Sequence, residues 1–222
     1  MMCWRNRGML VLGIVCLAFA GCESVPRVDH ARTGPFYIPT NVRGVDRFPA
    51  TVKRIAILPV AGLPEIPEEN LARLDSSFSS EFNRSARAEA VLVSRDLLAR
   101  LAGARQLTSV EVLPHDLLSR LKGATSADAI LFIDLTAYSP YPPLKLGIRS
   151  KLVDIASGEI LWAFDNLFDA NEPAVANAAR RHYLDSNASE FVKGDLSSTV
   201  LQNPTRFGSY VAFSTFVTLP KR

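Results

Sequence analysis

The sequence has few of the residues and motifs that carry most enzyme and metal chemistry. It contains three histidines, His30, His115 and His182, which are far apart in the chain. A glycine-rich phosphate loop, a GxSxG nucleophile motif and an HExxH zinc motif are absent from it. The sequence therefore predicts a protein that is not an enzyme, with no catalytic residues, no cofactor, no metal site and no small-molecule substrate.

Cysteine is scarce as well, and all of it lies at the start of the chain. The three cysteines are Cys3, Cys16 and Cys22. The remaining 200 residues therefore hold no disulfide, CxxC redox motif, cysteine metal site or cysteine nucleophile. Their stability must come from an apolar core, which a single domain of this length is large enough to bury.

The chain also lacks an excess of charge of either sign. It has 25 Lys and Arg against 22 Asp and Glu. Removal of the first 21 residues, which include Arg5 and Arg7 and no acidic residue, would leave 23 basic residues against 22 acidic ones. The sequence shows no stripe of basic residues, so a nucleic-acid partner is not expected.

What the sequence does contain begins with an export signal. Arg5 and Arg7 precede an apolar run over residues 9–20, about a dozen residues. This run is too short to span a bilayer, which takes ~20 apolar residues. The next letters, Phe-Ala-Gly-Cys at 19–22, resemble a bacterial lipobox, although Phe19 departs from the usual leucine. The alternatives are an ordinary secretory signal and an uncleaved anchor.

The lipobox resemblance implies a lipid attachment site at Cys22, which would be the first residue of the mature protein. Fatty acyl chains such as palmitate would then anchor the chain, each buried CH₂ contributing about 0.8 kcal/mol. In lipoproteins of this kind, aspartate after the cysteine tends to retain the protein in the inner membrane. This chain has Glu23 there, so we expect an outer-membrane protein that faces the periplasm.

Residues 22–50 are predicted to be a flexible tether between the signal peptide (1–21) and a periplasmic α/β domain (51–222). They show no apolar periodicity. Fully extended, the 28 residues that follow Cys22 would reach at most about 90–100 Å. The tether is broken by four prolines and two glycines, Pro26, Gly34, Pro35, Pro39, Gly44 and Pro49.

The pattern after residue 50 predicts an α/β fold with a mixed β-sheet of about five strands flanked by helices. The expected strands are 52–60, 90–94, 127–139, 146–155 and 159–168. The expected helices are 67–84, 96–104, 116–124, 172–185 and 204–219. Both 52–60 and 90–94 read as strands buried on both faces. The segment 204–219 fits helix or strand, and we predict a helix.

Two of these helices repeat one pattern. DLLARLAGA (96–104) and DLLSRLKGA (116–124) match at a spacing of twenty residues. Gly103 and Gly123 each stand where a glycine commonly ends a helix. Two copies are too few for a solenoid, so we interpret them as two short amphipathic helices that meet the same packing demand.

Three further segments resemble a known domain. They are RIAILPV (54–60), ADAILFIDLTAY (127–138) and the hairpin KLVDIASGEILWAFD (151–165). Together they resemble the periplasmic α/β domain shared by the amino-terminal domain of TolB, the curli-secretion lipoprotein CsgG and the penicillin-binding-protein activator LpoB. The resemblance spans about residues 52–170. It implies a fold and a compartment, and a protein that acts through binding.

Other candidate sites are isolated in the sequence. Ser119 and Lys122 match the SxxK spacing of serine hydrolases, but the companion motifs SDN and KTG are absent. The remaining candidates are the acidic helix start Glu65, Glu68 and Glu69, the pair Asp165 and Asp169, the basic cluster Arg180, Arg181 and His182, and the aromatic loop 138–146. The loop would anchor a partner or cover a sheet end.

The leading hypothesis is a membrane-anchored lipoprotein whose domain binds another cell-envelope protein in an assembly or regulatory role. The alternative is a curli-channel-like subunit of a secretion pore, which would use the hairpin 146–168. The second strand of that hairpin reads as buried on both faces, which favours a soluble core. A serine hydrolase built on Ser119 and Lys122 is the remote alternative.

Overall fold

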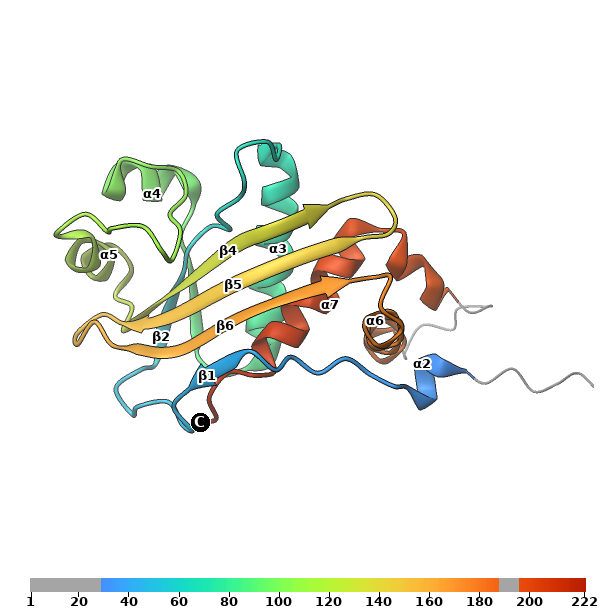
Figure 1. The fold of residues 1–222 in the computed structure, drawn as a ribbon. Helices are drawn as coiled ribbons and strands as arrows, with labels where there is room; N and C mark the ends of the chain where they lie inside the picture. The colour runs from blue at the N-terminus through green and yellow to red at the C-terminus, as the bar shows by residue number, and fades with distance from the viewer. Residues whose placement is uncertain (1–28, 188–195) are drawn as a thin grey trace, which may run out of the picture.

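The computed structural model describes residues 29–187 and 196–222. Within them lies one mixed sheet of six strands in the order β1-β6-β5-β4-β2-β3 (Figure 1). The strands are β1 Val42–Gly44, β2 Arg54–Ile57, β3 Glu89–Leu92, β4 Ala129–Ser139, β5 Lys145–Asp154 and β6 Ile160–Asp169. β2 runs parallel to β3 and β4, and the other pairs are antiparallel. The predicted α/β fold with a mixed sheet is confirmed, with one strand more than expected.

The helices cover the two faces of the sheet unequally (Figure 1). They are α2 His30–Thr33, α3 Glu68–Ser85, α4 Arg95–Ala102, α5 Leu117–Thr125, α6 Pro173–Ser186, the 3₁₀ helix η1 Ser197–Leu201 and α7 Pro204–Phe216. α3, α6 and α7 pack on one face, while α4 and α5 cover only the β2 and β4 part of the other. The segment 204–216 is a helix, as predicted.

The core explains the continuous apolar runs of the sequence. β4 turns Leu131 and Ile133 toward α3 and α7, and it turns Ile130 and Phe132 toward α4 and α5. A strand covered on both faces is apolar at every position rather than at alternate ones. None of the helices in the described ranges is long and apolar enough to cross a membrane.

Residues 29–50 differ from the tether expected for them. β1 pairs with β6, Phe48 is buried, and the Tyr37 ring meets the Phe168 ring edge to face at 5.2 Å. The tether prediction is therefore wrong for residues 29–50, which belong to the folded unit. The segment has no periodicity because it adds a three-residue edge strand and single side chains rather than an apolar stripe. The predicted residues 22–28 of the tether and the signal peptide lie outside the described residues.

Two local expectations also change. The segment 90–94 was expected to be buried on both faces, but β3 is an edge strand with Glu89 and Leu92 exposed. A short apolar run cannot distinguish these positions. Gly103 ends α4 in the left-handed region, as predicted. Gly123 does not end α5, which continues to Thr125.

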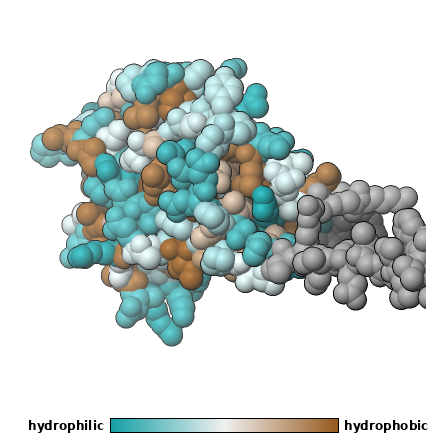
Figure 2. Space-filling view, turned by 45° about the vertical axis from the view of Figure 1, so that its right-hand side comes forward, coloured by the Kyte–Doolittle hydropathy of each residue, from teal (hydrophilic) through white to brown (hydrophobic). Residues whose placement is uncertain are grey.

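Hydrophilic side chains form most of the face drawn in Figure 2. Hydrophobic side chains make several separate patches within it. Scattered patches of this kind are normal for a folded protein.

Candidate functional site

A hollow of about 360 Å³ lies where β2 and β3 end, between these strands and α3. Its walls include Ile57, Phe78 and Ile133, and Leu92 stands at the open side. Open α/β sheets commonly bind ligands at the carboxyl ends of their strands. The hollow therefore lies where the topology favours a site.

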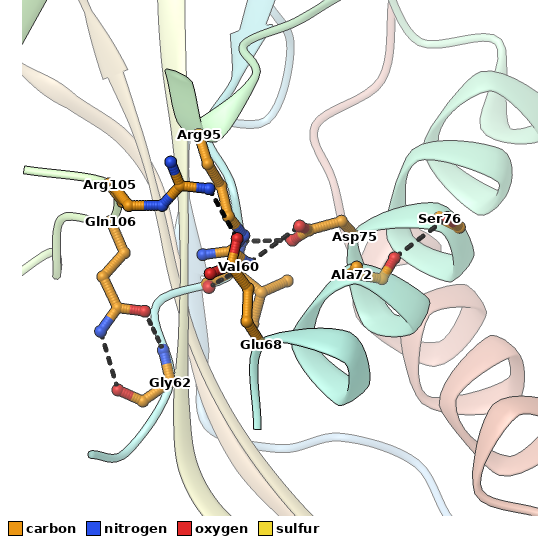
Figure 3. Close-up of polar contacts among 9 residues, drawn as sticks. All are labelled: Val60, Gly62, Glu68, Ala72, Asp75, Ser76, Arg95, Arg105 and Gln106. Atoms are coloured by element: carbon orange, nitrogen blue, oxygen red, sulfur yellow. Dashed lines mark hydrogen bonds and ion pairs between the residues drawn. The ribbon is translucent and has the colours of Figure 1, made fainter. Parts of the chain in front are cut away.

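One ion pair fixes the wall of this hollow (Figure 3). Arg95, the first residue of α4, donates from Nη2 to Asp75 Oδ2 at 2.8 Å and to the Val60 carbonyl at 3.0 Å. Asp75 Oδ1 accepts the Val60 N–H at 2.6 Å. The pair thus joins α3, the segment after β2 and the start of α4.

Burial raises the pKa of the Asp75 carboxyl, and the Val60 N–H and the Arg95 guanidinium act in the opposite direction. The Asp75 carboxylate and the Arg95 guanidinium neutralise each other. The arrangement suits a rigid wall, because each group is held by the other and by the backbone of Val60.

An outer polar layer holds the neighbouring loops (Figure 3). Arg105 bridges Glu68 of α3 at 2.7 Å and Asp96 of α4 at 2.5 Å. Gln106 accepts the Gly62 N–H at 3.1 Å and donates to the Gly62 carbonyl at 3.3 Å. Glu68, a candidate acid or base in the sequence, is thereby a partner in an exposed ion pair.

Beside the hollow runs the edge of the sheet. Glu89 and Val93 donate their N–H groups to the Lys53 and Ile57 carbonyls on the β2 side. Backbone N–H groups alternate in direction along a strand. The N–H groups of Ala90 and Leu92 therefore point away from β2. Among residues 29–187 and 196–222, no other strand pairs with β3. The strand therefore presents backbone donors and acceptors at a two-residue spacing.

The catalytic and metal candidates of the sequence are not brought together. Ser119 and Lys122 are exposed on α5. Asp165 pairs with Arg149 at 2.9 Å, and Asp169 pairs with Lys145 at 2.8 Å. The described part of the chain holds no group of three His, Cys, Asp or Glu side chains suited to a metal ion.

The basic cluster on α6 divides between surface and interior. Arg181 pairs with Asp185 at 2.9 Å. His182 is half-buried, with its ring stacked on Phe213 at 4.6 Å and its Nε2 at 3.9 Å from Glu81. Burial is the main cause that lowers the pKa of His182. Arg181 is therefore exposed, while Arg180 and His182 are half-buried.

The other predicted anchors have different outcomes. Of the predicted aromatic loop, Tyr138 lies in β4 and is half-buried, while in the loop between β4 and β5 Tyr141 is exposed and Leu144 is buried. The loop therefore both covers a sheet end and exposes one aromatic ring. The hairpin expected of a pore subunit lies between β1 and β4, with one face against α6 and α7. Leu167 is exposed on the other face, so the prediction that its second strand is buried on both faces is wrong. Cys22 lies outside the described residues.

Comparisons with known proteins found similar solved structures, at low sequence identity. No family model and no curated protein matches the chain. A PelC dodecamer from Paraburkholderia phytofirmans is 12% identical and covers 77% of this chain and 95% of its own, with a TM-score of 0.41. Lipoprotein GNA1162 from Neisseria meningitidis is 15% identical over 62% of this chain and 95% of its own, with a TM-score of 0.41. The LpoB C-terminal domain from Salmonella enterica is 12% identical over 55% and 86%, with a TM-score of 0.36.

LpoB is one of the proteins that the sequence resembles, so the predicted structural similarity to this group is confirmed. The similarity concerns the fold. At such identities and TM-scores it assigns no activity, partner or location to this chain.

Proposed function

We propose that this protein is a bacterial lipoprotein, held at the outer membrane by lipid on Cys22, whose periplasm-facing domain binds another envelope protein. Its role would be in assembly or regulation, without catalysis. The observation that supports a binding role is the outer side of β3, beside the hollow, which pairs with no strand of the described residues.

The geometry favours an extended segment of the partner. Outward backbone groups at residues 90 and 92 complement another strand, because strand hydrogen bonds repeat every second residue. Leu92 is 56% exposed, so apolar surface adjoins these groups. Alternate side chains of an added strand point to the same face, so one of them would enter the hollow. The Asp75–Arg95 pair would keep that hollow open.

The anchor is tested at the native amino terminus. Mass spectrometry of protein extracted from its own membranes is expected to find Cys22 as the first residue, carrying acyl chains. Cys22→Ser is expected to abolish the acyl mass. An unmodified Cys22, or a mature end elsewhere, would contradict the lipoprotein assignment.

The binding surface is tested by crosslinking in intact cells. A photoreactive residue at position 92 is expected to give one discrete adduct with an envelope protein. The matched control is position 112, where Val112 is 97% exposed in the loop before α5. Ala90→Pro removes an outward N–H, a change that edge strands tolerate, and it should abolish the adduct without unfolding the domain. Equal adducts from both positions, or an adduct unaffected by Ala90→Pro, would overturn strand addition.

A further inference from the structure

A second hollow, of about 600 Å³, lies at another place on the molecule, between residues 36–39, α6 and α7. Four apolar side chains around it are exposed. Ile38 is 74% exposed and Val217 53%, and Phe36 and Phe213 are also exposed. We call this surface, together with the arginines around it, the α6–α7 groove.

Arginines surround the apolar part of the groove. Arg84 and Arg181 line it, and Arg32 lies beside it on α2. Their carboxylate partners are Glu81, Asp185 and Asp29 respectively. Glu81 is buried, so the exposed charge on this surface is more basic than acidic. Apolar and aromatic side chains flanked by arginine are the composition of surfaces that lie in the interfacial region of a bilayer.

The chain enters the folded unit next to this groove. Asp29 caps α2, which lies beside α6 (Figure 1). Asn177 donates to the Pro35 carbonyl at 3.2 Å, and the Arg181 guanidinium lies 6.0 Å from the Phe36 ring centre. The segment that carries Phe36 and Ile38 is therefore fixed along α6, close to residue 29.

This position limits how far the groove can lie from the anchor. Cys22 and Asp29 are seven positions apart in the sequence, and a chain of seven residues spans at most about 25 Å. A tether that ran to residue 50 would have allowed about 90–100 Å. The short connection keeps the groove within reach of the membrane that holds Cys22.

We infer that the α6–α7 groove docks on the surface of the anchoring bilayer, with Phe36, Ile38, Phe213 and Val217 in its interfacial region. The inference rests on the proposed lipid anchor at Cys22. A second copy or a protein segment could fill an apolar groove, but only the bilayer is brought to it by the connection to residue 29. Docking would hold the domain in one orientation.

The test uses the full, natively lipidated chain in vesicles of phosphatidylethanolamine and phosphatidylglycerol. Ile38→Cys carries an environment-sensitive dye, since the chain has no cysteine after Cys22. The matched control is Val112→Cys, in the loop between α4 and α5 at the opposite end of the sheet from α2 (Figure 1). Flotation of the vesicles reports the anchor separately from the dye.

We expect a blue shift of the dye at position 38, with several-fold stronger quenching by brominated lipid than at position 112. Replacing Phe36 and Phe213 by serine should reduce that quenching while the protein still floats. Flotation with equal quenching at both positions would overturn docking and leave the anchor standing. Failure to float would overturn both. A shift that depends on protein concentration in neutral detergent micelles would assign the groove to a second copy instead.

Discussion

At the scale of single residues, the Asp75–Arg95 pair joins three segments that are distant in the sequence. The two charges are largely buried, so the loss of one leaves the other without its partner. Neither residue is marked by a local pattern. Ser94 could be predicted as the start of α4, but nothing in the sequence shows that the next side chain reaches a carboxylate twenty residues earlier.

We expect Asp75→Asn to lower the free energy of unfolding by about 1–3 kcal/mol, the range for a hydrogen bond to a buried charged group. The measurement is urea denaturation at pH 7. Asp116→Asn is the control, because it removes an exposed pair with Arg120 that should contribute less than about 1 kcal/mol. Equal losses of unfolding free energy from the two substitutions would show that the Asp75–Arg95 pair stabilises the fold no more than an exposed pair does.

His182 is expected to make stability depend on pH. Burial and the positive charge of Arg84 lower its pKa in the folded protein, against the opposing effect of Glu81. The unfolded chain therefore binds more protons near pH 6, and the stability contributed by neutral His182 is lost as pH falls through the folded pKa. The difference in unfolding free energy between wild type and His182→Gln should shrink from pH 7 toward pH 5. A difference that stays constant from pH 7 to pH 5 would contradict a role of His182 in this pH dependence.

At the scale of elements, the sequence was informative wherever an element buries a continuous stripe or run. The helix 67–84 and the strands 127–139 and 146–155 were predicted within two residues. Exposure of β3 could not be predicted, since four apolar letters fit a central or an edge strand equally well. The candidate binding surface was missed for this reason.

The two glycines of the repeated helix pattern provide a test at this scale. Gly123 lies inside α5, and the position that a Cβ would take there has no neighbouring atom within 4 Å beyond the backbone of its own helix. Gly103 ends α4 at φ +77°. Gly123→Ala should therefore raise the unfolding free energy by about 0.5–1 kcal/mol through its higher helix propensity.

Gly103→Ala should lower the unfolding free energy by about 1 kcal/mol, because a left-handed backbone is strained with a Cβ. Thermal denaturation of the two variants beside the wild type decides the matter. A shift of both melting temperatures in the same direction would contradict the different backbone roles of these glycines.

At the scale of the whole molecule, the two proposed surfaces would serve different neighbours. The α6–α7 groove adjoins the segment that leads toward Cys22. The hollow beside β3 has the start of α4 in its wall, and α4 lies at the opposite end of the sheet from α2 (Figure 1). A domain docked through the groove would present its α4 end away from the bilayer. This arrangement depends on residues 29–50 being part of the fold, which local sequence patterns did not indicate.

Asn166 shows how strongly the domain depends on that segment. Its side chain is buried on β6, and Oδ1 accepts from the Tyr37 hydroxyl and from the N–H groups of Thr40 and Asn41 at 3.3–3.4 Å. Its Nδ2 donates to the Asn41 carbonyl at 3.1 Å. A protein that begins at residue 51 would lose all of these partners and the ring contact on Phe168.

We therefore expect a form that begins at residue 51 to be less stable than one that begins at residue 23 by at least about 3 kcal/mol, the sum expected from an unpaired buried amide and newly exposed aromatic surface. Urea denaturation of the two forms measures the difference. Asn166→Ala should cost about 1–3 kcal/mol in the longer form and much less in the shorter one, where its partners are already gone. If the substitution costs the same in both, or if the two forms are equally stable, residues 29–50 are a tether after all and the short reach to the membrane no longer holds.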